Sequence, residues 1–342
     1  MRVTIARDVR LSLSALTGAA MLASVLSYAA PTSVATEGYP TDWAVDPATP
    51  GDNVPSAGRS LFDFVVVRND GNRKVYDVPF PFSALIERVE RHLQADGSGS
   101  LPLKRVLIPL GRSLQRASAA PEFFKYPRVV MVPDAEPHPS GNDAGMLMKD
   151  RLYLGYQEKA NIIEVISYNE AAGRFEFQLV KDYRAGGKPR VFYANRAICT
   201  ACHQNAAPLF SRQVWDETNA NPRIAALLRE QRRDFYGIDS DRGVDVPYAI
   251  DNATDRANLY SAYQLLWRAG CGSAIDREAA LRCRASLYTA ALQYCLSGRQ
   301  RFDATSRTFR EHVVATFTRS AHERWPRGLK ITNPDIPNRD PF

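Results

Sequence analysis

The clearest chemistry in this 342-residue sequence lies in one short run near its middle, Cys199-Thr200-Ala201-Cys202-His203. Two thiols at this spacing can each add across one of the two vinyl groups of a haem, and the histidine that follows is then held beneath the iron as its proximal ligand. The thioether bonds retain the haem whatever its affinity, which suits an exported protein. Because the C-x-x-C-H run occurs once, we predict one covalent haem c.

The same residues have two other interpretations. A redox-active Cys199–Cys202 disulfide is typical of a thioredoxin-like βαβ unit, whereas the chain beyond Cys202 reads as helical. Half of a zinc site would need further ligands from a chain with only five histidines and five cysteines. We therefore favour haem attachment.

With these residues the sequence resembles the c-type cytochromes, strongly over Cys199–Phe210 and loosely over its helical half. In small cytochromes c a Pro-Leu pair soon after the haem histidine is common, and its proline carbonyl accepts the second ring N–H of that histidine. The resemblance assigns this role to Pro208. A C-terminal amphipathic helix near the motif is also usual in the family, and here it corresponds to Ser306–Trp325. We also expect Trp215 to pack on the porphyrin.

One departure from the family concerns the sixth iron ligand. Small cytochromes c take a methionine some tens of residues after the motif, but this chain has no methionine after Met148. Three alternatives stay open: Met146 or Met148 from the preceding domain, a histidine, or an open or water-filled position. In an extended strand both methionines would also point to the same side as Leu152 and Leu154, which is typical of core packing.

The histidines offer little support for the second alternative. His312 and His322 lie in the last predicted helix, on the side away from its apolar stripe, as solvated histidines do. That stripe consists of Phe309, Val313, Phe317 and Ala321. Nothing in the sequence singles out His92 or His138. An open iron would favour a haem enzyme of peroxidase type, or a haem-based gas or redox sensor, over a simple electron carrier.

The remaining cysteines, Cys271, Cys283 and Cys295, are spaced by twelve residues. Cys283 and Cys295 would lie about 18 Å apart on one helix, too far for a disulfide. Cys271 falls in the loop before that helix and can reach Cys283, two turns in. We predict a Cys271–Cys283 disulfide and a free, buried Cys295, because an exported chain meets an oxidising compartment.

The N-terminus predicts export. Three arginines in the first ten residues precede an apolar run, Leu11–Ala30, that ends in small residues, which is the pattern of a signal peptide over residues 1–35. Cleavage after Ala29 or after Ala35 fits the preference for small residues at the cut. We expect a periplasmic or otherwise exported protein, attached to a membrane only if this segment stays uncleaved.

Beyond the signal peptide we predict an α+β fold. A β-rich domain (61–194) precedes an all-α, cytochrome c-like haem domain (195–330), with a linker or extended arm at 36–60 and an irregular tail at 331–342. Runs of β-branched and aromatic residues predict strands at Phe62–Val67, Arg105–Pro109, Pro127–Val132, Arg151–Tyr156, Ile162–Tyr168, Arg174–Val180 and Pro189–Tyr193. The turn Asn169–Gly173 makes a hairpin of two of them.

Helical spacing predicts the other elements. One helix interrupts the strands, with Leu85, Ile86, Val89 and Leu93 on one face and Gly97 as its end. Asn221 caps the first helix of the second half, with Pro222 at its first position. Three more helices follow, at about Thr254–Ala269, Asp276–Ser297 and Ser306–Trp325.

Charge follows the same division of the chain. Residues 196–342 carry a net charge of +5 and residues 36–195 a net charge of zero, within +7 for the whole chain. This mild excess argues against a nucleic-acid partner, and 45% hydrophobic residues exclude a largely disordered chain. We expect an electron carrier whose positive half favours an acidic redox partner.

Overall fold

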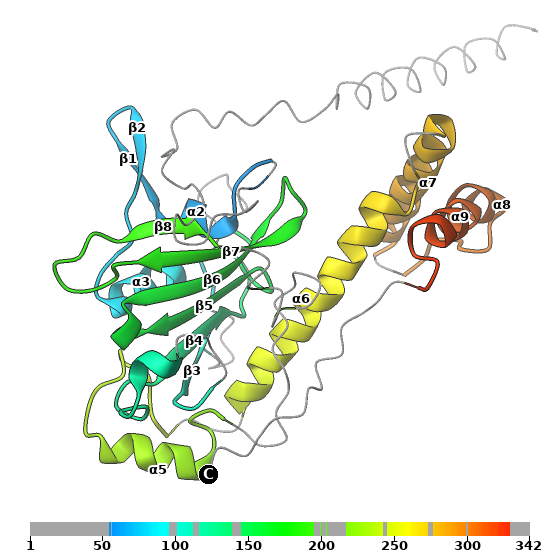
Figure 1. Ribbon diagram of the computed structural model, residues 1–342. Helices are drawn as coiled ribbons and strands as arrows, with labels where there is room; N and C mark the ends of the chain where they lie inside the picture. Colours follow the sequence, from blue (N-terminus) through cyan, green and yellow to red (C-terminus); the bar gives the residue numbers. More distant parts are fainter. Residues whose placement is uncertain are drawn as a thin grey trace, which may run out of the picture. The chain divides into compact units, whose positions relative to one another are not determined.

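The structure is a computed structural model, and it describes residues 55, 57–95, 101–111, 116–138, 145–194, 199, 203, 217–241, 245–272, 276–298 and 300–328. The fold is α+β, as predicted, and is built around one six-stranded sheet (Figure 1). Within these ranges no helix combines the length and the hydropathy that a membrane crossing needs. The predicted signal peptide, most of the arm and the tail lie outside the described residues.

The sheet is an antiparallel meander in which each strand pairs with the next along the chain. Its strands are β3 (Leu103–Ile108), β4 (Arg128–Pro133), β5 (Leu152–Gln157), β6 (Ile162–Asn169), β7 (Arg174–Lys181) and β8 (Arg190–Tyr193). All six agree with predicted strands to within two residues at each end. In the hairpin between β6 and β7, Gly173 has a φ of +61°, a conformation that glycine adopts without steric cost.

The first predicted strand, Phe62–Val67, is wrong, because this segment forms helix α2 (Leu61–Val66). In the helix its apolar side chains can be buried together, whereas a strand would point neighbouring residues to opposite sides. The buried apolar residues are Phe62, Val65 and Val66. A separate two-stranded hairpin follows, made of β1 (Val67–Asp70) and β2 (Arg73–Tyr76).

One face of the sheet carries what we call the first core, to which α2, α3 (Phe82–Glu90) and α5 (Pro222–Glu230) contribute. The predicted apolar face of α3 is confirmed, but the helix ends at Glu90, and Leu93 lies beyond it in a bridge to Pro137. The predicted end at Gly97 lies outside the described residues. The cap of α5 is confirmed, since the Asn221 side chain accepts the Arg223 N–H at 3.0 Å.

The opposite face carries the second core, formed with helix α6 (Asp245–Ala269). Alternate residues of β4 divide between the two, Val129 and Met131 facing the first core and Val130 and Val132 the second. The helix begins at Asp245 rather than at Thr254. The small side chains of Ala253 and Ala257 let α6 approach the strands closely. The Tyr153 hydroxyl donates a hydrogen bond to the Ala253 carbonyl at 2.7 Å.

Both α5 and α6 follow the predicted boundary at residue 194, yet α6 packs on the sheet and α5 contributes its buried side chains to the first core. These two helices therefore do not make an all-α core of their own, as the predicted haem domain would require. The physical reason is that each apolar face of a sheet must be covered by another element. Helix α6 provides this cover for the second core, and α5 joins α2 and α3 in the first core.

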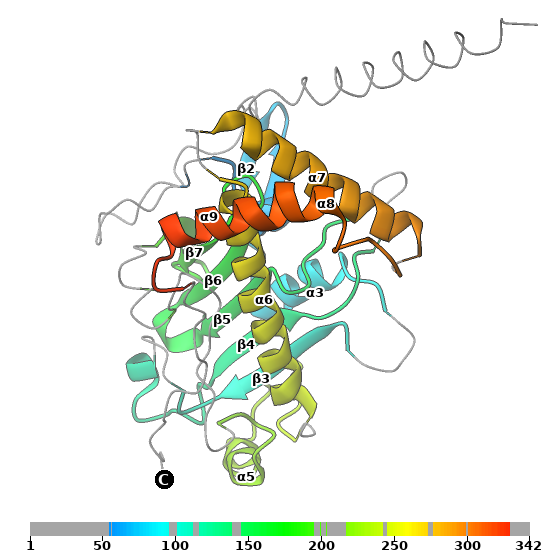
Figure 2. The ribbon, with the colours of Figure 1, turned by 90° about the vertical axis from the view of Figure 1, so that its right-hand side faces the viewer.

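The last helices pack against one another (Figure 2). They are α7 (Arg277–Leu296), α8 (Arg307–Phe309), the π-helical turn η4 (Arg310–Val314) and α9 (Ala315–Arg324). The last three follow directly on one another and fill the helix predicted at Ser306–Trp325. The Asp276 side chain caps α7, as predicted, by accepting the Ala279 N–H at 3.0 Å. The Ser306 side chain accepts the Phe309 N–H at 3.3 Å.

Candidate functional site

Cys199 and His203 lie on one helical turn. The His203 backbone N–H donates to the Cys199 carbonyl at 2.8 Å, the i to i−4 bond of an α-helix. Residues four apart in such a turn share one face, so the thiol and the imidazole project on the same side. Cys199 is half-buried and packs against the second core.

The His203 ring is held against strand β7. Its centroid lies 5.6 Å from that of Phe177, at an interplanar angle of 43°, and Phe177 is only 4% exposed. The ring itself is half-buried, and its Nδ1 atom is shielded from solvent. An imidazole fixed beside an apolar surface in this way is suited to act as a metal ligand, because ordering the ring beforehand lowers the entropic cost of binding.

These residues fit a c-type haem. A thiol and an imidazole share one turn, and the surface beside them is made of aromatic and branched apolar side chains, which match the apolar faces of a porphyrin. The second core, against which Cys199 packs, includes Ile166, Phe175, Phe177, Ala194 and Ile250, and Phe177 contacts the His203 ring. Cys202, Pro208 and Trp215 lie outside the described residues.

The structure does not bring Met146 or Met148 to the motif. Met148 is fully buried in the first core, and Met146 packs against the same cluster. Cys199 packs against the second core, on the other face of the sheet. The sheet therefore lies between these methionines and the motif, in agreement with core packing as their alternative role.

The histidines of the last helix differ from one another. His322 is exposed, as predicted, with Nδ1 2.8 Å from the Thr318 carbonyl oxygen of its own helix. His312 is half-buried, and its Nδ1 lies 3.0 Å from the Ser286 hydroxyl of α7, so the prediction that it points to solvent is wrong. His312 lies in the π-helical turn, whose wider winding rotates side chains away from their α-helical positions.

The other two histidines lie beside α3. The His138 backbone N–H donates to the His92 carbonyl at 2.8 Å. Burial, with the charges of Arg91 and Arg88, lowers the pKa of His92. In the described part of the chain no three His, Cys, Asp or Glu side chains gather as a metal-binding group.

The predicted disulfide is confirmed. Cys271 and Cys283 are joined, with Cα atoms 5.5 Å apart, and the bond ties the end of α6 to the second turn of α7. Cys295 is free, as predicted, but it is exposed and not buried. The reason is that α7 is covered on one side only, and Cys295 lies on another.

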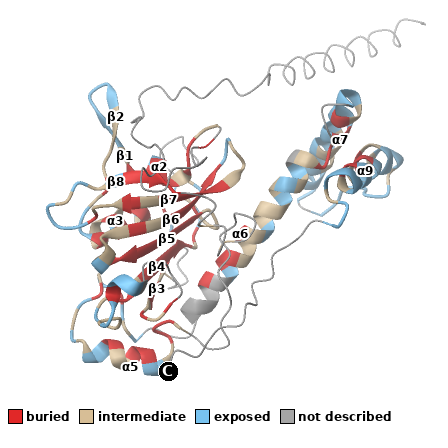
Figure 3. Ribbon diagram, in the orientation of Figure 1, coloured by how far each residue is buried: buried red, intermediate tan, exposed pale blue. Residues whose placement is uncertain are grey.

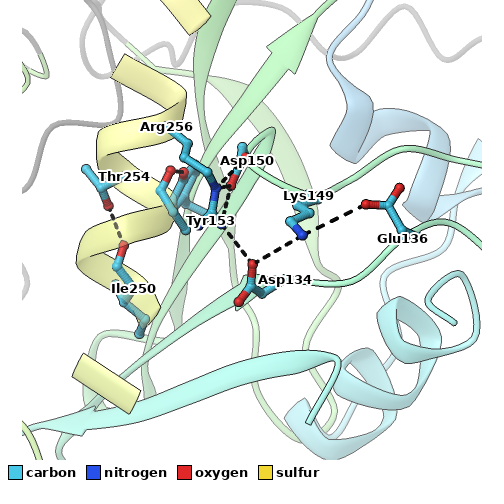
Figure 4. A network of polar contacts seen from close by, with 9 residues as sticks. Asp134, Glu136, Lys149, Asp150, Tyr153, Ile250, Thr254 and Arg256 are labelled. Atoms are coloured by element: carbon cyan, nitrogen blue, oxygen red, sulfur yellow. Dashed lines mark hydrogen bonds and ion pairs between the residues drawn. The ribbon is translucent and has the colours of Figure 1, made fainter. Parts of the chain in front are cut away.

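A polar network that the sequence does not reveal ties α6 to the sheet (Figure 4). The Arg256 guanidinium donates to both carboxylate oxygens of Asp150, with Nε–Oδ2 and Nη2–Oδ1 distances of 2.8 and 2.7 Å, and to Asp134 at 2.8 Å. Lys149 Nζ lies 3.9 Å from both Asp134 and Glu136. The network holds the cover of the second core in place, although its members are too distant in sequence to form a motif.

A second unpredicted network surrounds Asp63 of α2, which is fully buried. Its carboxylate accepts the hydroxyls of Tyr193 at 2.5 Å and Tyr76 at 3.0 Å, and the Gln178 side-chain amide at 2.9 Å. Burial raises the pKa of Asp63 above its usual range, although these hydrogen bonds and the charge of Arg59 oppose the shift. The network anchors α2 to β7 and β8.

Comparison with known proteins adds no relative to this picture, since no family model, curated protein or solved structure matches the chain. Its function must therefore be argued from its own residues.

Proposed function

We propose that this protein is an exported mono-haem c-type cytochrome that transfers single electrons. The observation that carries the proposal is the C-x-x-C-H run, folded at Cys199 and His203 as a helical turn that lies against the second core. Cys199 and Cys202 would form the thioether bonds, and His203 would be the proximal ligand.

The surrounding residues have distinct parts in this arrangement. Phe177 and its neighbours exclude water from one side of His203 and fix the plane of its ring. The Pro208 carbonyl would accept the second ring N–H of His203, which sets the tautomer, and Trp215 would pack on the porphyrin. When bound, the haem supplies an iron that cycles between the ferrous and ferric states.

Two observations support export and the kind of partner. The Cys271–Cys283 disulfide fits an oxidising compartment, which agrees with the signal peptide predicted from the sequence. The net charge of +5 on residues 196–342 favours a redox partner protein with an acidic surface.

Haem attachment can be tested with matched cysteine variants. In a host that attaches c-type haem, the wild-type chain should keep its haem in denaturing gels and give the pyridine haemochrome band of a haem with two thioether bonds. Cys202→Ala should shift that band and lower haem retention, whereas Cys295→Ser, at an exposed free thiol, should behave as wild type. An unchanged band in Cys202→Ala would falsify the proposal.

A second candidate function is favoured by the position of the methionines. No methionine follows Met148, and the sheet lies between Met148 and the motif. If the sixth position of the iron is open, a haem enzyme of peroxidase type or a haem-based gas or redox sensor becomes the better description. Low-spin, six-coordinate spectra in both redox states support the electron carrier. A high-spin ferric spectrum with rapid CO binding after reduction supports the enzyme or the sensor.

A further inference from the structure

Helix α7 carries an exposed apolar stripe at coiled-coil spacing. Its members follow one another at intervals of four, three, four and three residues, which places them along one side of the helix. They are Leu281, Ala285, Tyr288, Leu292 and Cys295, and we call them the α7 stripe. Leu281 is 52%, Tyr288 65% and Leu292 45% exposed, although leucine is among the residue types most often buried. Figure 3 shows exposed positions along much of α7.

The opposite side of α7 already has a partner. Ala280 and Cys283 are buried, Cys283 by its disulfide to Cys271, and Ser286 meets His312 of η4. The α7 stripe is therefore an additional face, and it needs a cover that is itself apolar.

Charge selects the kind of cover. Residues 285–298 contain no charged side chain, whereas the first half of the helix has a net charge of +2 from Arg277, Glu278, Arg282 and Arg284. A strongly charged partner would gain no ion pair along the second half. The uncharged half of a second copy can lie beside the arginine-bearing half without repulsion if the two helices run antiparallel, and antiparallel helix dipoles also attract.

We propose that the α7 stripe binds the α7 stripe of a second copy of this chain, in antiparallel orientation. In this alignment Leu281 faces Leu292 of the second copy, and Ala285 faces Tyr288 of the second copy. A small residue then lies opposite a large one in each central layer, which favours interdigitation. A parallel pair would instead set Tyr288 against Tyr288 and Arg277 near Arg282.

The proposed contact is small. Two antiparallel helices that meet over about two heptads bury less than the roughly 800 Å² per partner of a standard interface. We therefore expect a dissociation constant in the micromolar range, about 1–100 µM, and a dimer that forms and dissociates with concentration.

Sedimentation velocity of the full-length exported chain tests the stripe. Wild type should change from monomer to dimer across that concentration range. Leu292→Glu should weaken the dimer at least about tenfold, because a carboxylate would be buried in the apolar seam. The matched control is Leu147→Glu, at a leucine that is 40% exposed but lies outside α7. Circular dichroism and the intact Cys271–Cys283 disulfide show that each variant is folded.

Three outcomes would overturn the proposal. The first is a wild-type chain that stays monomeric throughout, and the second is an equal effect of Leu292→Glu and Leu147→Glu. The third is binding of the monomer to vesicles of anionic phosphatidylglycerol that Leu292→Glu abolishes, since the occupant of the α7 stripe would then be a lipid surface.

Cross-linking tests the orientation. Position 278, an exposed glutamate one step before Leu281 in the stripe, would face Cys295 of the second copy. In Glu278→Cys, oxidised glutathione should join the two thiols into an intermolecular disulfide and leave as two molecules of reduced glutathione. The same variant combined with Leu292→Glu should lose most of the cross-link. A rapid Cys295–Cys295 cross-link in the wild type would overturn the antiparallel orientation.

Discussion

All six residues of β5 are buried, whereas only Ala280 and Cys283 are buried among the twenty residues of α7. The sheet is covered on both faces, so its stability comes from apolar packing. The α7–α9 cluster, by contrast, has a disulfide, helix caps and one packed side, and it leaves a row of apolar side chains exposed. A hydrophobic core therefore stabilises the sheet region, whereas a disulfide and local contacts stabilise the α7–α9 cluster.

The largest expected effect is the loss of a core aromatic side chain. Phe82 is fully buried and stacks on Tyr156 with ring centroids 4.4 Å apart. Phe82→Ala should lower the free energy of unfolding by about 3–5 kcal/mol, because it leaves a cavity in the first core. Phe302→Ala removes a phenylalanine next to α8 that is 42% exposed, and it should change the value by no more than about 0.5 kcal/mol. Urea titrations of both variants measure the free energy of unfolding. An equal decrease in the two variants would contradict the difference between the sheet region and the α7–α9 cluster.

A smaller and more local effect is expected from the disulfide. The bond closes a loop between cysteines twelve residues apart, and its loss should cost roughly 3 kcal/mol of local stability. In Cys283→Ser, amide hydrogen exchange should become faster in α7, α8 and α9, with β4, β5 and β6 unchanged. Cys295→Ser serves as the control at a free thiol. Faster exchange throughout the sheet would show that the α7–α9 cluster supports the core, contrary to the comparison.

The smallest expected effect is a pH dependence that belongs to the sheet region. In the unfolded chain Asp63 ionises near its ordinary pKa of about 3.9, but burial raises the pKa of the folded group. Between the two values the folded protein binds more protons, so stability falls as the pH rises, by at most about 1.4 kcal/mol per pH unit.

Asp63→Asn should remove the contribution of Asp63 to the pH dependence of the free energy of unfolding. Urea titrations at several pH values measure this dependence. Asp303→Asn is a suitable control in the C-terminal region, because the pKa of Asp303 is lowered by hydrogen bonds from Thr305 and its slope has the opposite sign. A slope that is unchanged in Asp63→Asn would mean that another group titrates in this window.

The strands are predictable from the sequence because they are short runs rich in β-branched and aromatic residues, which favour extended backbone. The segment Phe62–Val67 is an exception, since a short run of five apolar residues and one aspartate is compatible with a strand or a helix. Helix α6 also begins earlier than its pattern indicates. The alanines at 253 and 257 that bring it close to the sheet carry little hydrophobic signal of their own.

The residues of the candidate site also differ in how far the sequence predicts their role. Cys199, Cys202 and His203 stand out because their chemistry depends on spacing within one helical turn, and the disulfide partner of Cys271 follows from the rise of a helix. The place of Met148 depends instead on which face of the sheet it joins. No local pattern encodes that choice, and the same holds for Arg256, whose partners are more than a hundred residues away.

Local rules thus account for the C-x-x-C-H motif, the strands, the helix caps and the disulfide, because each depends on residues a few positions apart or on the fixed rise of a helix. Tertiary contacts alone determine that α6 covers the sheet, that α5 joins the first core and that Cys199 lies on the face away from Met148. They also leave Cys295 exposed. These features arise from contacts between distant segments, where the burial of apolar surface over the whole molecule determines which elements meet.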